Sequence, residues 1–229
     1  MIHINQISKT YGTGKVGLHS LDLTITPGEI VALTGGNGAG KSTMIHLLTN
    51  ILKPTSGTID WGEKKYSYMP DDLEFPTHVT ALEWLTLLGA FKEVNDKLIL
   101  RAATDVGLES HLHQRISTFS KGMKQRLAFA QTLLANEEVM ILDEPTNGLD
   151  PYWVKWMKTT LDAKRKEGKT IIFSTHDLSF VEELADVMLF FHEGKVLFQY
   201  KAQEWRAKPK SLESIVIDQL VQVYEKTPK

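Results

Sequence analysis

Phe119-Ser-Lys-Gly-Met-Lys-Gln-Arg-Leu-Ala-Phe-Ala130, followed by Val139-Met-Ile-Leu-Asp-Glu-Pro-Thr-Asn-Gly-Leu-Asp150, decides the fold. In the first stretch, Ser120 is placed to cap the N-terminus of a helix, and Gly122 lets a ligand approach the backbone. Helix N-termini suit phosphate because they present backbone N–H groups and the positive end of the helix dipole. This stretch therefore predicts a phosphate contact at the start of a helix.

The second stretch begins with the apolar run Val139–Leu142, which has the length of a buried strand and ends in two carboxylates. We expect Asp143 to hold Mg²⁺, directly or through water, and Glu144 to polarise an attacking water. Paired carboxylates at a strand end can instead form a solvated turn. The catalytic interpretation is favoured because the chain also carries a phosphate-binding loop.

That loop lies between an apolar strand, expected over Glu29–Thr34, and a helix expected over Lys41–Leu52. It matches the pattern G-x-x-x-x-G-K-[ST], in which Lys41 reaches the β- and γ-phosphates and the Ser42 hydroxyl binds Mg²⁺. A glycine-rich turn that matches by accident is the alternative, and the flanking strand and helix disfavour it. The expected nucleotide-binding residues are Gly35, Gly36, Asn37, Gly38, Ala39, Gly40, Lys41, Ser42 and Thr43.

Composition limits the class of protein. The 229 residues suggest one large domain or one domain with a subdomain. Lysine plus arginine (26) nearly balance aspartate plus glutamate (28), which argues against a dedicated nucleic-acid binder. The absence of cysteine excludes disulfides and thiolate metal sites. No apolar run approaches the roughly 20 residues that span a bilayer, and the N-terminus lacks a signal-peptide pattern, so a membrane role would need another chain.

Periodicity and turn signals place the other elements. Strands are expected over Ile2–Ile7, Val16–Ile25, Thr58–Trp61, Tyr66–Met69, Thr170–Ser174, Val187–Phe191 and Val196–Phe198, with Glu193-Gly194 as a hairpin signal between the last two. Helices are expected from Thr80 to about Phe91, over Asn95–Val106, from Pro151 to about Glu167 and over Ser211–Tyr224, with capping boxes at Thr80–Glu83 and Ser179–Glu182. The mostly helical span from residue 80 to 135 separates two strand-bearing regions. It therefore predicts a helical subdomain inserted into an α/β core.

Taken in their order along the chain, the phosphate loop, the stretch 119–130 and the stretch 139–150 resemble the motifs of ATP-binding cassette (ABC) ATPases. The resemblance covers roughly residues 2 to 198. It implies an α/β P-loop NTPase fold: a RecA-like core with an N-terminal antiparallel β-subdomain and an inserted α-helical subdomain. We expect a single ATP-binding domain over residues 1–229. Residues 1–70 and 136–200 would form the core with its β-subdomain, 71–135 the helical signature subdomain, and 201–229 a C-terminal helical tail.

The resemblance assigns three further residues. Tyr11 is similar to the aromatic residue that stacks on adenine, with an ordinary packed loop tyrosine as the alternative. His176, after the strand Thr170–Ser174, is similar to the switch histidine that contacts the γ-phosphate, although a lone histidine is usually structural or solvated. Asp150 is expected across a dimer interface, near the opposite phosphate loop.

Two departures from the family pattern matter. The common signature Leu-Ser-Gly-Gly-Gln is replaced here by Phe-Ser-Lys-Gly-Met. With Lys121 and Met123, this segment is similar to the signature variant of the ABC-2 exporter branch. Where the family has a glutamine after a Tyr-x-Pro strand end, this chain has Asp71. A carboxylate there could bind Mg²⁺ but adds negative charge near phosphates. Asp72 is an alternative equivalent, and both could merely cap the following turn.

The family implies a head-to-tail dimer in which ATP and Mg²⁺, held by Lys41 of one subunit, are covered by Ser120 and Gly122 of the other. The leading hypothesis is the ATPase subunit of an ABC transporter of the ABC-2 exporter type, acting on separate integral-membrane permease subunits at the inner face of the cell membrane. The partner is a second copy or a paralogous subunit, and no nucleic acid is expected. The alternatives are a soluble ABC ATPase of cofactor assembly, cell division or regulation, and a degenerate cassette without turnover. The sequence does not identify the transported substrate.

Overall fold

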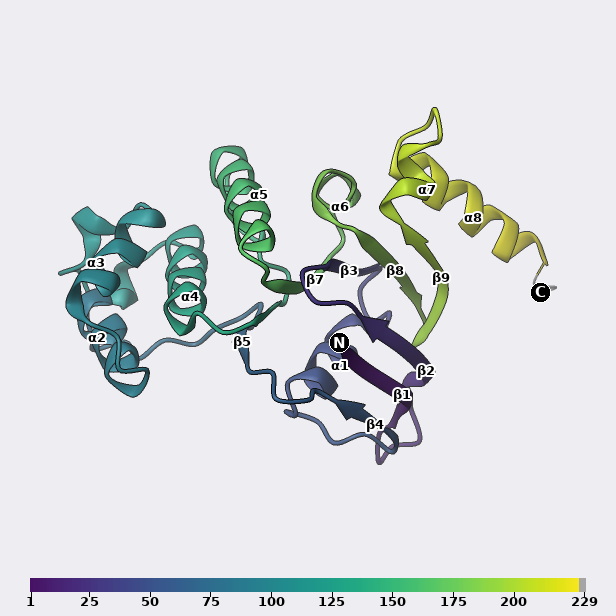
Figure 1. Ribbon diagram of the computed structural model, residues 1–229, viewed down its shortest axis with the longest axis horizontal. Coiled ribbons are helices and arrows are strands. Elements are labelled where there is room, and N and C mark those ends of the chain that lie inside the picture. The colour runs from purple at the N-terminus through teal and green to yellow at the C-terminus, as the bar shows by residue number, and fades with distance from the viewer. Residues whose placement is uncertain (227–229) are drawn as a thin grey trace. The chain divides into compact units, whose positions relative to one another are not determined.

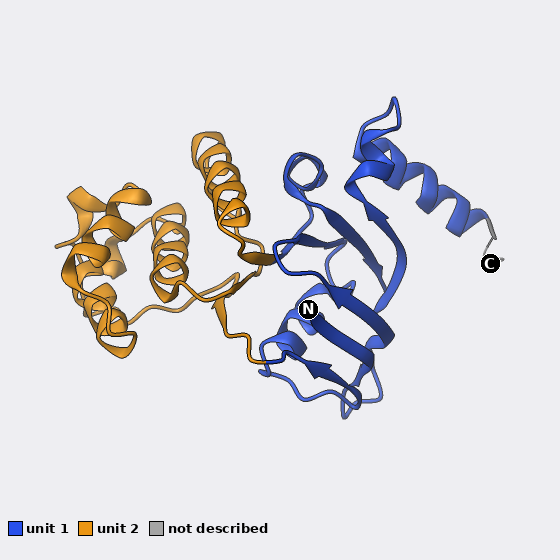
Figure 2. Cartoon of the chain, viewed as in Figure 1, with its two compact units in different colours: residues 1–62, 172–229 blue, residues 63–171 orange. Residues whose placement is uncertain are grey.

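The computed structural model describes residues 1–226, and its elements are labelled along the chain in Figure 1. The chain forms two compact units (Figure 2). Unit 1 combines residues 1–62 with the chain from residue 172 onward, and unit 2 is the intervening segment 63–171. The expected tail, 201–229, includes three residues that lie outside the described part. No helix within residues 1–226 combines the length and apolar character needed to cross a membrane.

Unit 1 contains the N-terminal antiparallel sheet that the family resemblance implies. Its strands β1 (Ile2–Thr10), β2 (Val16–Ile25) and β4 (Ser56–Asp60) pair in the order β2-β1-β4. The buried residues of β1 are Ile2, Ile4 and Ile7, so the alternation slips by one residue. A bulge at Gln6, which has a φ of 46°, accounts for this slip and keeps Ile7 on the buried face.

Unit 1 also holds the strand that leads into the glycine loop. β3 (Ile30–Gly35) pairs in parallel with β8 (Val187–His192), which continues through a hairpin into β9 (Lys195–Lys201). All of β3 is buried, as expected for a strand within a parallel pair. The hairpin signal was correct, because the turn residues Glu193 and Gly194 both have the positive φ that tight two-residue hairpins require.

The helix after the glycine loop, α1 (Lys41–Leu48), is four residues shorter than predicted. Thr49 takes over as its C-cap, and its hydroxyl donates to the carbonyl of Ile45 at 2.9 Å. Asn50 then adopts a φ of 55°, a left-handed conformation that asparagine tolerates and that ends a helix. The apolar residues at 51 and 52 continue the helical pattern but not the helix.

The capping box predicted at Ser179–Glu182 is wrong. The helix α6 (Leu178–Leu184) follows β7 (Thr170–Thr175) and is capped by Asp177, whose Oδ1 accepts from the N–H of Phe180 at 3.0 Å. An aspartate directly after the strand provides a carboxylate cap before Ser179 is reached. Glu182 instead accepts from the N–H of Leu212, at the start of α8 (Leu212–Lys226). The short helix α7 (Ala202–Arg206), which the sequence did not predict, buries Trp205.

Unit 2 contains the parallel strands β5 (Tyr66–Met69) and β6 (Val139–Leu142) together with four α-helices. The capping box at Thr80 is confirmed: Glu83 donates its N–H to Oγ1 at 3.2 Å and accepts from the N–H of Thr80 at 2.7 Å. The helices of the unit are α2 (Ala81–Phe91), α3 (Asp96–Asp105), α4 (Lys121–Ala135) and α5 (Pro151–Lys166), with short 3₁₀ turns η1 (Glu109–His111) and η2 (Ile116–Thr118).

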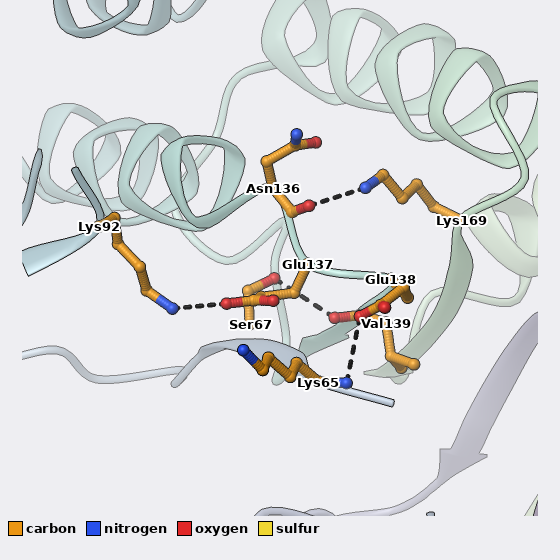
Figure 3. Close-up of polar contacts among 8 residues, drawn as sticks. All are labelled: Lys65, Ser67, Lys92, Asn136, Glu137, Glu138, Val139 and Lys169. Atoms are coloured by element: carbon orange, nitrogen blue, oxygen red, sulfur yellow. Dashed lines mark hydrogen bonds and ion pairs between the residues drawn. The ribbon is translucent and has the colours of Figure 1, made fainter. Parts of the chain in front are cut away.

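The link from α4 to β6 is held by polar contacts from three separate segments (Figure 3). The Lys169 ammonium donates to the carbonyl of Asn136 at 2.8 Å, and Lys92 forms an ion pair with Glu137 at 2.5 Å. The backbone N–H of Lys65 donates to the Glu138 carboxylate at 3.1 Å. These contacts set where β6 begins, and β6 ends at the two carboxylates Asp143 and Glu144.

Glu138 should make the stability of the chain depend on pH. Backbone N–H groups, its own and that of Lys65, together with the charges of Lys64 and Lys169, lower the pKa of this carboxyl below its ordinary value of 4.5. The folded state therefore favours the charged form. The resulting stabilisation is present above the unfolded pKa and is lost as the pH falls through the folded pKa.

We expect Glu138→Gln to reduce stability at pH 7 and to flatten the loss of stability on acidification, so that the two proteins converge as the pH falls through the lowered pKa of Glu138. Urea denaturation followed from pH 7 to pH 3 measures this. Parallel curves for wild type and variant over the whole range would contradict the assignment.

Candidate functional site

The glycine loop of unit 1 is shaped by a close backbone contact. Gly35 ends β3 with a φ of 136°, and a Cβ added there would lie 2.2 Å from the carbonyl oxygen of Phe191 on β8. Only glycine fits this position, because any side chain would require the parallel pair β3–β8 to separate. The loop therefore leaves the sheet at a fixed point and turns directly into α1.

The tip of the loop is exposed and free of side-chain crowding. A Cβ built on Gly36 or Gly38 meets no atom within 4 Å, and Asn37 is exposed between them. The N-terminus of α1 has no side-chain cap and no acidic residue in its first turn. An uncapped helix N-terminus beside an exposed glycine loop suits an anionic phosphate, because it offers backbone N–H groups and the positive end of the helix dipole.

Lys41 adds a positive charge to the loop. The residue is only 6% exposed, and its ammonium donates to the carbonyls of Gly35 at 2.7 Å and Gly36 at 3.2 Å. The side chain thus folds back over the loop that it follows, and the next residue, Ser42, is exposed. The roles of the ammonium in binding phosphate and of the hydroxyl in binding Mg²⁺ stay predictions.

Tyr11 lies beside this loop. Its hydroxyl and that of Thr43 are 3.0 Å apart and hydrogen-bonded, and its ring lies against the backbone of Gly17, where a Cβ would meet Cε2 at 2.4 Å. The ring is thus held next to the start of α1, and its stacking on adenine stays a prediction. His176 follows the last residue of β7, is exposed, and precedes the helix cap Asp177.

The two carboxylates of unit 2 follow β6 as predicted. Asp143 is 5% exposed and Glu144 is 9% exposed. Glu144 has a φ of 44°, which is uncommon for a residue other than glycine, and its carbonyl accepts from the N–H of Asn147 at 3.1 Å and from Nε2 of Gln125 at 3.2 Å. Such a conformation costs about 1–3 kcal/mol and persists where the surroundings hold it. The two donors on one carbonyl supply that restraint.

The signature segment is the start of α4. Ser120 caps this helix as predicted, with Oγ accepting from the N–H of Met123 at 3.2 Å. A Cβ on Gly122 would lie 2.8 Å from the carbonyl oxygen of Gly148, so this glycine is also required by packing within the protein. The stem of Lys121 covers Gly148 from the other side. The signature segment and the turn before α5 are therefore packed together.

Asp150 ends that turn and caps α5, accepting at Oδ1 from the N–H groups of Tyr152 at 3.0 Å and Trp153 at 3.1 Å. Arg126 of α4 stacks on Trp153 at 4.2 Å from the ring centroid and donates to the carbonyl of Val106 at 2.8 Å. Burial lowers the pKa of Arg126, and the charge of Asp150 opposes this shift. Arginine suits this position because it stacks and donates several hydrogen bonds at once.

Asp71, the residue at the unusual position, is linked to the same turn. Its Oδ1 accepts from Nδ2 of Asn147 at 2.7 Å. Nearby, burial and then the negative charges of Asp143 and Asp71 raise the pKa of Tyr68 from 10.0 to about 12. A phenol with this pKa stays protonated at neutral pH.

The predicted residues thus divide between the units. Unit 1 contains Tyr11, the loop residues Gly35, Gly36, Asn37, Gly38, Ala39, Gly40, Lys41, Ser42 and Thr43, and His176. Unit 2 contains Asp71, Ser120, Gly122, Asp143, Glu144 and Asp150. Sequence reasoning missed Gln125, Arg126 and Asn147, whose partners lie 19 or more residues away, so no local pattern identifies them.

Comparison with known proteins identifies the same family as the motifs of unit 1 and unit 2. The family model described as "ABC transporter" matches residues 18–147. The lantibiotic transport ATP-binding protein SrtF of Streptococcus pyogenes is 35% identical over 87% of this chain and 90% of its own. The SkfA peptide export ATP-binding protein SkfE of Bacillus subtilis is 34% identical over 90% of this chain and 94% of its own.

Two solved structures are similar in fold. An ATP-binding subunit of an ABC transporter has a TM-score of 0.86 and 25% identity, covering 96% of this chain and 99% of its own. A dimeric ATP-binding cassette in a post-hydrolysis state, bound to ADP and Pi, has a TM-score of 0.80 and 25% identity, covering 88% of this chain and 99% of its own. With the phosphate loop, the carboxylate pair and the signature helix in place, this chain belongs to the ABC transporter ATP-binding family and is an ATPase of that family.

Proposed function

We propose that this chain acts as a head-to-tail dimer in which ATP closes the subunits, hydrolysis reopens them, and a separate membrane permease converts the motion into export. One observation carries the proposal: residues 1–226 contain one phosphate-binding loop and one signature helix start. In the head-to-tail dimer that the family resemblance implies, the loop of one cassette and the signature of the other meet on the same ATP. The dimeric cassette among the similar structures and the export relatives support this arrangement.

Within one chain, the loop N–H groups and Lys41 would bind the ATP phosphates, and Tyr11 would stack on the adenine. Ser42 and Asp143 would hold Mg²⁺, with Asp71 as a further ligand. When bound, the metal would neutralise charge developing on the phosphates. Glu144 would accept the proton of the attacking water, and His176 would contact the γ-phosphate and orient that water.

From the opposite chain, Ser120, Gly122 and Asp150 would reach the same nucleotide. Ser120 and Gly122 stand at the positive end of α4, and Asp150 lies on the turn packed against them. We propose this segment as the partner's phosphate contact because helix N-termini attract anions. The second chain can be an identical copy or a paralogous subunit.

Subunit complementation tests the proposal. Lys41→Ala would remove the lysine of the loop, and Ser120→Arg would block the signature, so each variant alone should lose ATPase activity. A mixture of the two chains would form one intact site in each mixed dimer, and we expect partial activity to return. The control places both substitutions in one chain: each dimer of this double variant with wild type has no intact site, so adding the double variant should lower the activity of a fixed amount of wild type. If mixing the single variants restores nothing, the signature does not serve the partner's nucleotide.

We further propose that residues 71–135 form the helical subdomain that receives the permease, beside a core of residues 1–70 and 136–200. This would place the chain at the inner face of the membrane. Affinity purification from detergent-solubilised membranes should recover an integral-membrane protein, with ATPase activity coupled to it. Nucleic-acid-stimulated ATPase activity without a membrane partner would instead favour a soluble ABC ATPase.

A further inference from the structure

The hydrogen bond between Asp71 and Asn147 joins two loops that are 76 residues apart in sequence. It is short, at 2.7 Å from Nδ2 to Oδ1, and partly buried. A carboxylate only accepts hydrogen bonds, so it selects the NH₂ side of the asparagine amide and fixes its orientation. The contact is charge-assisted and therefore stronger than a bond between neutral groups.

Asn147, which is held by Asp71, in turn restrains the backbone of Glu144. Its backbone N–H donates to the Glu144 carbonyl at 3.1 Å, and Nε2 of Gln125 donates to the same oxygen at 3.2 Å. Glu144 has the left-handed φ of 44°, which a residue with a side chain keeps only where its surroundings enforce it. Asn147 is thus one of the groups that hold the backbone of the proposed catalytic base.

The end of strand β5, just before Asp71, contacts the turn at a second point. The carbonyl of Met69 accepts from the N–H of Asp143 at 2.8 Å, two residues before Asp71. The segment from Met69 to Asp71 therefore contacts the turn 143–150 at its first residue and near its middle. Such a two-point attachment sets both the position and the orientation of the turn.

We propose that Asp71 is a positioning residue for ATP hydrolysis: through Asn147 it holds the turn 143–150 and, with it, the strained backbone of Glu144. This rests on the proposed role of Glu144 as the base. It gives the unusual aspartate a task that is separate from binding Mg²⁺, since one carboxylate oxygen is already used by Asn147. The loop after β5 and the catalytic turn then move as one piece.

Hydrogen exchange in the nucleotide-free full chain tests the contact without using activity. Asp71→Ala should speed exchange of the amides of Asn147 and Leu149, which donate within the turn at 3.1 Å each. Asn147→Ala should do the same at Leu149, whereas amides of α1 should be unchanged in both variants. Glu74→Ala, which removes an exposed carboxylate three residues beyond Asp71, is the matched control. Unaltered exchange of the turn in Asp71→Ala would overturn the proposal.

Kinetics of the same variants test the consequence. We expect Asp71→Ala and Asn147→Ala each to lower kcat about tenfold with little change in KM for ATP, and the double variant to be no worse than either single one. Asp71→Asn retains an acceptor oxygen and should recover most of the rate. Additive losses in the double variant would mean that the two residues act independently.

Two further measurements separate this inference from the site assignment. If Asp71 serves only as a metal ligand, Asp71→Ala will raise the Mg²⁺ concentration for half-maximal activity, whereas Asn147→Ala will change neither that concentration nor kcat, and the positioning role is refuted. If Glu144→Gln abolishes turnover while Asp71→Ala does not change it, the proposed function stands and this inference fails. If Glu144→Gln leaves turnover intact, the proposed base itself is wrong.

Discussion

Glu144→Gln should lower steady-state ATP hydrolysis by at least about a hundredfold while leaving ATP binding intact. Glutamine has the shape of glutamate but cannot accept a proton from water at neutral pH. Its backbone can keep the left-handed φ and both hydrogen bonds to the carbonyl, because these do not involve the side chain. The phosphate loop, built from unit 1, is unaffected by the change.

The variant should also accumulate as a closed dimer with ATP, since closure no longer leads to hydrolysis. ATP binding by fluorescence, phosphate release and size-exclusion chromatography with and without ATP measure the three effects. Glu109→Gln, an exposed glutamate on η1, is the control and should behave as wild type. Undiminished hydrolysis in Glu144→Gln would reassign the base, with His176 as the next candidate.

Features specified by neighbouring residues were predicted correctly from the sequence. The glycine loop, the cap at Ser120 and the capping box at Thr80 each lie within a few residues of chain. Their hydrogen bonds are local, so residue type and spacing decide them. The same holds for the hairpin at Glu193-Gly194, where the turn requires positive φ.

Features that depend on distant partners were missed or misplaced. The box at Ser179 failed because Asp177 was the better-placed cap and Glu182 bonds to Leu212, 30 residues away. The link between Asp71 and Asn147 spans 76 residues, and Asp71 alone looked only like a metal ligand or a turn cap. Gly122 was interpreted through phosphate alone, whereas its contact with Gly148 is a packing requirement that no local pattern reveals.

Gly35→Ala should cost about 3 kcal/mol of unfolding free energy, because the substitution creates a steric clash together with backbone strain. Its Cβ would lie 2.2 Å from the carbonyl oxygen of Phe191, which is backbone and cannot rotate away, and 3.2 Å from the Cβ of Ala39. The φ of 136° adds strain for any residue with a side chain. Relief of this clash would require β3 and β8 to separate, and the point at which the loop leaves the sheet would no longer be fixed. Nucleotide binding should therefore be lost together with stability.

Gly36→Ala, one residue further on, is the matched control that separates the two roles of the loop. A Cβ there meets nothing within 4 Å, so stability in urea should stay close to wild type. The methyl group would instead project from the exposed tip of the loop, where the phosphates are proposed to bind, and we expect ATP affinity to fall about tenfold. Equal destabilisation by both variants would refute the backbone-clash account of Gly35. Unchanged ATP affinity in Gly36→Ala would show that the phosphates do not approach the loop at that point, which would move the binding surface toward Gly38 and the start of α1.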